Sequence, residues 1–335
     1  MPMQAQPHVP LLFPGGKRYR GLGPALREIF GERLQRIPIS AGFTCPTRDG
    51  TVGHGGCLFC DAGGAGAEFA QTGLPVREQV AHGIAQALKG RIGAQKFVAY
   101  FQAFTNTYAE PERLRALYEA GLSDPRVVAL AIGTRPDCLP EAVLDVLEEF
   151  SARTFLWVEI GLQSTRNETL RAFGRGHTVE AFVDAAERLR RRGIRFLGHV
   201  ILGLPGDTAE DMLAGADLLS RAGAWGVKIH NLYVDAHSPL AERYRRGEIP
   251  LMDRAEYLDR VVRFLERLDP AIVVHRVLGQ APRNRLLAPR WCLDRDPFLL
   301  DLDRLLEERQ THQGARWAAE SSTSSEDFPN RPPTP

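Results

Sequence analysis

The feature that most constrains the fold is a regular alternation of two kinds of segment from residue 96 onward. A short run of β-branched and aromatic residues is followed by a polar or glycine-rich turn and an amphipathic stretch, at intervals of roughly thirty residues. Strands are predicted at residues 36–40, 96–102, 127–134, 154–163, 194–202, 226–234 and, more weakly, 271–278. Helices are predicted at residues 76–89, 111–121, 140–152, 178–192, 208–222 and 254–268.

Repeated units of this kind place parallel strands next to one another, with a helix in each connection. Six units indicate an α/β fold, a partial (βα)6 TIM-like barrel over residues 36–278, whose functional loops follow the carboxyl ends of the strands. Residues 1–35 are then an N-terminal extension, and residues 279–309, with three prolines and a leucine-rich helical pattern, form a small C-terminal cap. Residues 310–335, rich in Ser, Thr, Pro, Gln and Glu, are predicted to be a disordered tail.

Composition narrows the class of protein without identifying a partner. With 44% hydrophobic residues and a formal net charge of +1, the chain can bury a large core and is not a generally cationic nucleic-acid binder. Neither a signal peptide nor a membrane-spanning apolar run is evident, so we expect a cytoplasmic protein with no membrane partner. Five unevenly placed cysteines favour a reducing compartment, in which thiolates bind metals.

Three of these cysteines, Cys45, Cys57 and Cys60, lie in one short stretch directly after the first predicted strand. The stretch, residues 45–60, is called the cysteine loop below. Its four glycines permit the tight curvature that a loop around an inorganic core requires. A [4Fe-4S] cluster usually takes four thiolates, so three ligands would leave one iron open.

A structural zinc site is the alternative interpretation of the same residues. The spacing of Cys57 and Cys60 is that of a zinc knuckle, and His54 or Cys138 could supply a fourth ligand. Against this, the sequence has no second CxxC or HxxxH pair. Cys138 and Cys292 are isolated, which is typical of buried core cysteines.

Polar residues end several predicted strands, and a barrel would direct them toward one mouth. They are Gln102, Thr134, Arg135, Glu159, Gln163, Ser164, His199, Lys228 and His230. Singly, such residues are more often turn caps or satisfied core groups, but together they favour a cofactor pocket beside the cysteine loop. Walker, GxGxxG, GxSxG and HExxH motifs are absent from the sequence.

Arginines cluster at residues 188–195, and further arginines follow at 243–246 and 283–290. These side chains could contact RNA phosphates. The simpler interpretation is that residues 188–192 form the polar face of an amphipathic helix.

Seven ordered segments carry a resemblance to a known family. They are CPTRDGTVGHGGCLFC (45–60), YFQAFTNTYA (100–109), GTRPDCLP (133–140), VEIGLQS (158–164), GRGHT (174–178), HVILGLPGD (199–207) and APRNRLLAPRWC (281–292). The chain resembles the radical SAM enzymes, and within them the YhcC-like branch related to the radical SAM domain of Elongator-type tRNA-modifying enzymes. Eleven residues separate the first two cysteines, a longer gap than in the commonest radical SAM form.

The resemblance implies a [4Fe-4S] cluster on Cys45, Cys57 and Cys60 whose open iron binds S-adenosylmethionine. Reductive cleavage would then yield a 5′-deoxyadenosyl radical that abstracts hydrogen from substrate. It also implies that Phe59 packs near adenine, that Gln102 meets the methionine amino group, and that Gly203, Leu204 and Pro205 border adenine. Thr134, Arg135, Gln163 and Ser164 would line the cofactor, while His199, Lys228 and His230 are candidates for contact with substrate.

The resemblance further implies an electron donor such as flavodoxin or ferredoxin. A tRNA nucleoside, the wobble uridine, is the leading substrate hypothesis, and a small metabolite is the alternative. A non-catalytic zinc protein is the third hypothesis. Fewer than seventy residues follow Leu268, so we expect no acetyltransferase domain.

Overall fold

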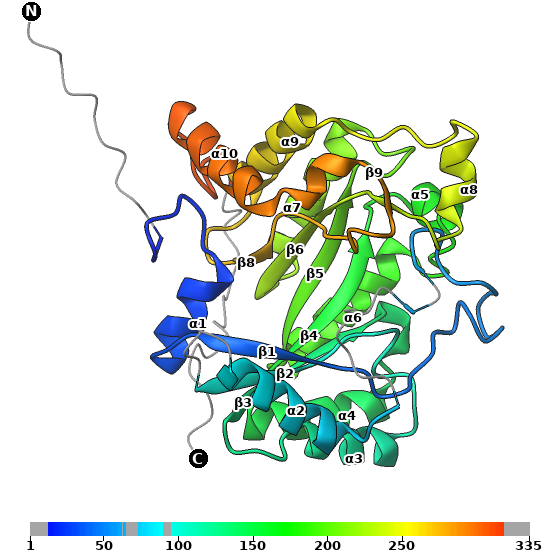
Figure 1. The fold of residues 1–335 in the computed structure, drawn as a ribbon, viewed down its shortest axis with the longest axis vertical. Helices are drawn as coiled ribbons and strands as arrows, with labels where there is room; N and C mark the ends of the chain where they lie inside the picture. The colour runs from blue at the N-terminus through cyan, green and yellow to red at the C-terminus, as the bar shows by residue number, and fades with distance from the viewer. Residues whose placement is uncertain (1–12, 62, 65–72, 90–94, 318–335) are drawn as a thin grey trace, which may run out of the picture.

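A computed structural model describes residues 13–61, 63–64, 73–89 and 95–317 (Figure 1). Its main sheet has seven strands, all parallel, in the order β1-β2-β3-β4-β5-β6-β8. The first and last strands do not pair with each other, so the curled sheet is an open, partial barrel. This arrangement confirms the predicted α/β fold class.

The strands of the main sheet are β1 (Leu34–Ile39), β2 (Lys96–Phe101), β3 (Val127–Thr134), β4 (Phe155–Gln163), β5 (Arg195–Leu202), β6 (Gly226–Asn231) and β8 (Val273–Arg276). The connecting helices are α2 (Val76–Lys89), α3 (Pro111–Gly121), α4 (Glu141–Arg153), α6 (Val179–Arg191), α7 (Ala209–Arg221) and α9 (Arg254–Arg267). Shorter helices are η1 (Pro136–Cys138), α5 (Asn167–Ala172) and α8 (Leu240–Arg245). The connecting helices cover the outer face of the sheet (Figure 1).

The inner face changes character along the strands. Side chains alternate across a strand, and the inward positions near the strand starts are apolar, including Ala129, Trp157 and Leu197. Two residues further along β4 and β5, the same inward face carries Glu159 and His199. An apolar layer therefore fills one end of the barrel interior, and the interior is polar toward the end where the strands terminate.

Helix α1 (Leu22–Phe30) completes the apolar end. It contacts both β1 and β8 (Figure 1), and its buried Ala25 and Leu26 join the inner apolar cluster. The carbonyl of Arg20 accepts a 2.7 Å hydrogen bond from the Val274 amide. The predicted extension thus supplies a helix that packs between the two edge strands of the sheet.

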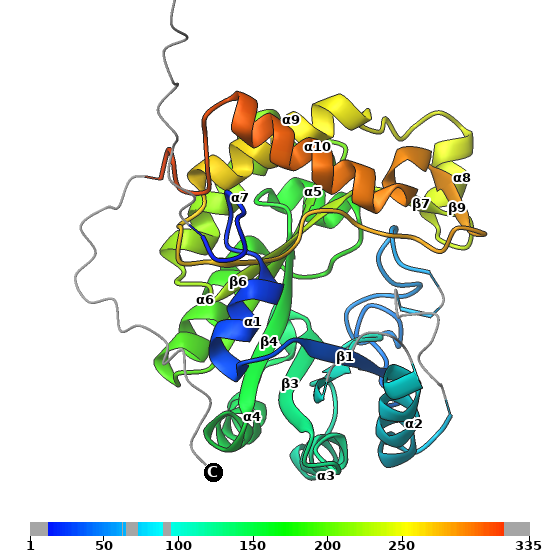
Figure 2. The same cartoon turned by 60° about the vertical axis from the view of Figure 1, so that its left-hand side comes forward.

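The chain leaves the main sheet after β6. The prediction of one strand over 226–234 is wrong, because β6 ends at Asn231 and the two-residue strand β7 (Val234–Asp235) pairs antiparallel with β9 (Leu286–Ala288). The Asn231 side chain accepts a 3.0 Å hydrogen bond from the Gly279 amide at this point. Within the predicted cap lie β9, η2 (Arg290–Leu293) and α10 (Arg295–Glu308), and α10 packs along α9 (Figure 2).

The predicted disordered tail begins too early. Residues 310–317 are placed, and Gln313 is completely buried. Its side-chain Nε2 donates to the backbone carbonyls of Asp269 and Ile272 at 2.7 and 2.8 Å. Its side-chain Oε1 accepts from the Arg20 backbone amide at 2.9 Å. These bonds stabilise a segment that is predominantly polar. Residues 318–335 lie outside the described part of the chain.

No helix in the described ranges is both long and apolar enough to cross a membrane.

We predict that Gln313→Ala lowers the free energy of unfolding by about 2–4 kcal/mol, because three backbone groups lose their partner in the interior. Urea unfolding followed by circular dichroism measures this change. Gln310→Ala, an exposed position, is the control. Equal stability of both variants would contradict the account of this segment.

Candidate active site

The cysteine loop is shaped by short-range backbone hydrogen bonds. The Arg48 amide donates to the Cys45 carbonyl at 2.8 Å, and the Gly56 amide donates to the Thr47 carbonyl at 2.9 Å. Gly56 has a φ of 81°, and a Cβ atom there would lie 2.8 Å from the Arg48 guanidinium. The positive φ would strain any residue with a Cβ atom, which favours glycine where the loop folds back on itself.

The loop brings all three cysteines to one cavity of about 270 Å³ at the carboxyl ends of the strands. Cys45 Sγ lies 2.9 Å from the Thr105 hydroxyl. Arg175 donates a 3.2 Å hydrogen bond to Cys57 Sγ. Phe59 also lines the cavity, and its ring stacks on Phe173 with centroids 6.3 Å apart.

The electrostatic environment differs among the three thiols. A hydrogen bond with Cys60, together with the nearby Arg175 charge, holds the pKa of Cys57 well below its ordinary value, although burial opposes this. The same hydrogen bond and burial raise the pKa of Cys60. Burial also raises the pKa of Cys45. The loop thus places one readily ionised thiol between two thiols that retain their protons more strongly.

The two isolated cysteines are buried, as predicted. Burial raises the pKa of Cys138 to about 12 and that of Cys292 to about 11. Cys138 lines a separate groove, to which the cysteine loop contributes Pro46, Thr51 and Val52, and His54 is exposed. Among the described residues, no three His, Cys, Asp or Glu side chains are gathered around a single metal position. This holds for Cys45, Cys57 and Cys60 as well, so it does not separate zinc from a cluster. His54 and Cys138, the other candidate zinc ligands, do not line the cavity that the three thiols share.

Most predicted site residues meet in this cavity. Its walls include Gln102, Thr134, Arg135, Gln163, His199, Lys228 and His230. Gln102 Nε2 is buried and has no hydrogen-bond partner within the described residues. Three thiols, the soft ligands that iron–sulfur clusters take, and an unpaired amide donor beside them fit a cluster with a polar organic cofactor.

Four predicted residues lie outside the cavity wall: Ser164, Gly203, Leu204 and Pro205. Ser164 donates a 2.8 Å hydrogen bond to Asp207, and Leu204 is buried in an apolar cluster with Phe173 and Leu232. Contact of these four residues with a cofactor remains a prediction.

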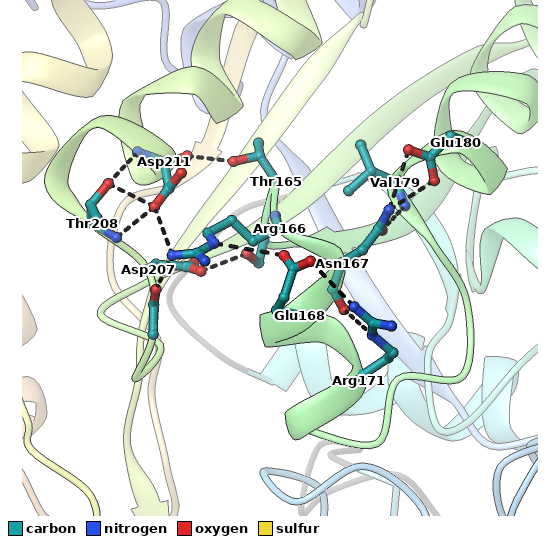
Figure 3. A network of polar contacts seen from close by, with 12 residues as sticks. Thr165, Arg166, Asn167, Glu168, Arg171, Val179, Glu180, Asp207, Thr208 and Asp211 are labelled. Carbon is teal, nitrogen blue, oxygen red and sulfur yellow. Dashed lines mark hydrogen bonds and ion pairs between the residues drawn. The ribbon is translucent and has the colours of Figure 1, made fainter.

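Figure 3 shows the polar contacts that join the turns following β4 and β5. Thr165 donates to the Asp211 carbonyl at 2.7 Å, and Arg166 donates to the Gly206 carbonyl at 2.6 Å. Asn167 accepts from the Val179 amide at 2.8 Å and so ties the same turn to α6. The network stabilises the rim of the barrel next to the cavity.

A buried network lies deeper in the barrel around Glu159, which is 2% exposed. Its Oε2 accepts hydrogen bonds from Tyr100 at 2.8 Å, from His199 at 3.0 Å, and from Lys228. Its Oε1 accepts from the Trp157 indole at 3.1 Å. Although burial opposes ionisation, the Lys228 charge and the His199 hydrogen bond hold the pKa of Glu159 well below its ordinary value. Burial lowers the pKa of Lys228 to about 7.

The sequence-based site omitted several residues of the cavity wall. Arg175 follows a short helix, Tyr100 lies inside a strand, and Arg276 ends β8, which lies within the weakest predicted strand. Arg175 and Tyr100 fall within the segments that carry the family resemblance, which was the available signal. Arg276 lies in none of those segments.

A second polar contact joins the cysteine loop to the C-terminal segment. Arg285 is ion-paired with both Asp61, the residue after Cys60, and Asp235 in β7. Its Nε donates to Asp235 at 2.9 Å. One guanidinium therefore connects the end of the cysteine loop with the β7–β9 pair.

The arginine-rich helix α6 is neutralised by carboxylates of the same chain. Arg192 contacts Asp145 and Glu148 at 2.7 Å, and Arg188 contacts Glu141 at 2.6 Å. These pairs favour the structural interpretation of the 188–192 run over an RNA-binding one.

Comparison with known proteins places the chain in a family. Residues 50–219 match the radical SAM superfamily, and residues 224–308 match the Radical_SAM C-terminal domain. The chain belongs to the radical SAM superfamily, whose members are enzymes that use a [4Fe-4S] cluster and S-adenosylmethionine.

Two bacterial relatives match over most of their length. The chain is 38% identical to the uncharacterized protein YtqA of Bacillus subtilis, over 89% of this chain and 92% of that protein. It is 36% identical to protein YhcC of Escherichia coli K12, over 85% of this chain and 91% of that protein.

Two archaeal proteins match more distantly. A tRNA uridine(34) acetyltransferase of Methanocaldococcus infernus is 32% identical over 37% of this chain and 23% of that enzyme. The solved structure of Elp3 from the same organism shares the fold, with a TM-score of 0.60 and 22% identity, over 71% of this chain and 60% of that chain.

We predict a pH-dependent contribution of Lys228 to stability. Because its pKa is lower in the folded chain than in the unfolded chain, the unfolded chain binds more protons between pH 7 and about pH 10. The free energy of unfolding therefore rises with pH over this range. Relative to Lys228→Met, the unsubstituted protein should gain roughly 2 kcal/mol between about pH 7 and pH 9.

Anaerobic urea unfolding at the two pH values measures this difference. Lys96→Met, at a lysine whose side chain is 38% exposed, reports the background of the substitution. The lowered pKa of Lys228 would be refuted if the free energy of unfolding of the unsubstituted protein, relative to that of Lys228→Met, stayed constant or fell as the pH rises.

Proposed function

We propose that Cys45, Cys57 and Cys60 hold the [4Fe-4S] cluster of this radical SAM enzyme, and that the adjoining cavity binds S-adenosylmethionine and substrate. The observation that carries the proposal is the meeting of three thiols, from one loop, at a single cavity with an unpaired donor, Gln102 Nε2. When bound, the cluster and its cofactor supply the one-electron chemistry that removes a hydrogen atom from a substrate.

The residues that line the cavity would have different roles in binding the cluster, the cofactor and the substrate. Arg175 would stabilise the Cys57 thiolate through its 3.2 Å hydrogen bond. Gln102 would accept a hydrogen bond from the amino group of the cofactor through its Oε1, while Phe59, Thr134, Arg135 and Gln163 line the cofactor. His199, Lys228 and His230, deeper in the barrel, would face the substrate. A flavodoxin or ferredoxin in the cytoplasm would supply the electron, in keeping with five free cysteines.

For the substrate we propose a tRNA nucleoside, the wobble uridine. The support is the partial match to a tRNA uridine(34) acetyltransferase and the fold shared with Elp3. A small metabolite is the second candidate. The ion pairs of Arg188 and Arg192 with helix α4 favour it, because they occupy charges that tRNA phosphates would otherwise contact.

We predict that Cys57→Ala abolishes both iron binding and 5′-deoxyadenosine release, since a cluster held by two thiolates is not retained. Anaerobic reconstitution, iron analysis and chromatography after dithionite reduction measure both. Cys138→Ala and Cys292→Ala remove equally buried thiols and serve as matched controls that keep both properties. A wild-type protein that is colourless and binds one zinc would overturn the assignment.

We predict that the reconstituted protein retains tRNA on a filter at low salt and releases it as salt is raised, because phosphate contacts release counterions. Duplex DNA of similar length controls for nonspecific attraction. Failure to retain tRNA at low salt would leave the metabolite as the substrate class while leaving the cluster assignment untouched.

A further inference from the structure

The cavity beside the cysteine loop is rich in cations. Its wall contains Arg48, Arg135, Arg175, Arg276 and Lys228. Among the described residues of that wall, Glu159 is the only carboxylate. A cavity so unbalanced in charge attracts anions.

Four of these cations already have partners. Arg135 pairs with Asp137 at 2.7 Å, and Lys228 pairs with Glu159. Arg175 donates to the Cys57 sulfur and to the Gly161 carbonyl. Arg48 donates to the carbonyl of Asp61.

Arg276 differs from the other four. Across the described ranges, its guanidinium makes no hydrogen bond and no ion pair, although it stands at the end of β8 on the cavity wall. Burial lowers its pKa. Holding an unpaired charge in such a place costs free energy, and a bound anion would offset that cost.

The neighbourhood of Arg276 provides further polar groups. In the sheet register, Arg276 pairs with Lys228, and Lys228 pairs with His199, so the three occupy one level across β8, β6 and β5. His230 Nε2 is buried on the same wall and finds no hydrogen-bond partner in the described structure. A guanidinium and an imidazole nitrogen, both without partners, thus face one space.

This region is distinct from the thiol end of the cavity. The arginines whose charges act on the thiols are Arg48, Arg135 and Arg175. The charge of Arg276 acts instead on Tyr100 and His230, and Tyr233, which both Cys60 and Arg276 influence, lies where the two regions meet.

We propose that Arg276 and His230 form an anion subsite that binds a phosphate or carboxylate group of the substrate. The inference rests on the proposed function, because it places the substrate in the cavity that also receives the cofactor. A guanidinium binds such planar or tetrahedral oxyanions through paired N–H groups. The substrate is therefore an anionic molecule, a nucleotide if the group is phosphate and an organic acid if it is carboxylate.

Anaerobic calorimetric titration of the reconstituted protein tests the subsite. The probes are inorganic phosphate, acetate, uridine 5′-monophosphate, uridine and S-adenosylmethionine. We expect phosphate or acetate to bind, and Arg276→Gln to weaken that anion by about tenfold or more, which corresponds to about 1.4 kcal/mol. Arg276→Lys should restore part of the affinity, and uridine and S-adenosylmethionine should bind both proteins equally.

The two anions separate the substrate classes. Preference for phosphate, with uridine 5′-monophosphate binding more tightly than uridine, indicates a nucleotide. Preference for acetate indicates a carboxylate-bearing metabolite. Arg304→Gln, which removes an exposed arginine of α10, is the matched control and should leave every affinity unchanged.

Three results would overturn the subsite: neither anion binds, Arg276→Gln binds the anion as tightly as the unsubstituted protein, or the variant loses S-adenosylmethionine affinity instead. Thermal unfolding separates a binding role of Arg276 from a structural one, because only the loss of a structural role would lower the melting temperature. With no ion pair to break, Arg276→Gln should melt no lower than the unsubstituted protein. A protein that takes up no iron yet shows the Arg276-dependent anion affinity would refute the proposed cluster and leave the subsite standing.

Discussion

The parallel course of all seven main strands is the constraint on which the rest of the structure depends. Strands that run the same way end at the same edge, so loops far apart in sequence meet there. The cysteine loop follows β1, while Gln102, Arg135 and Gln163 come from the ends of β2, β3 and β4. Because side chains alternate along each strand, the same arrangement also selects which residues face inward.

The interior is consequently divided by polarity. Apolar side chains such as Trp157 and Leu197 fill the end covered by α1, and Glu159 marks the change to a polar layer. The carboxylate is stabilised by Tyr100, His199 and Lys228, so the layer can hold charge away from water. Above it lie two regions of one cavity, the thiols of the cysteine loop and the cationic wall around Arg276.

Much of this arrangement can be predicted from sequence where a local pattern exists. The strand predicted at 127–134 coincides with β3, because its β-branched and aliphatic run is bounded by turns. The Arg285–Asp61 pair has no local signal, since 224 positions separate its members. The prediction of a disordered tail is wrong for Gln313, because hydrogen bonds to distant backbone groups hold this residue in place. Composition does not reveal such bonds. Arg276 was missed because only the folded sheet shows that it lacks a partner.

The central claim is that three thiolates of the cysteine loop leave one iron open for S-adenosylmethionine. Electron paramagnetic resonance of the anaerobically reconstituted, dithionite-reduced protein tests it most directly, with and without the cofactor. The account predicts a reduced [4Fe-4S] signal that changes when S-adenosylmethionine is added, because the cofactor would bind the open iron. A cluster signal unaffected by saturating cofactor, or no cluster signal at all, would contradict it.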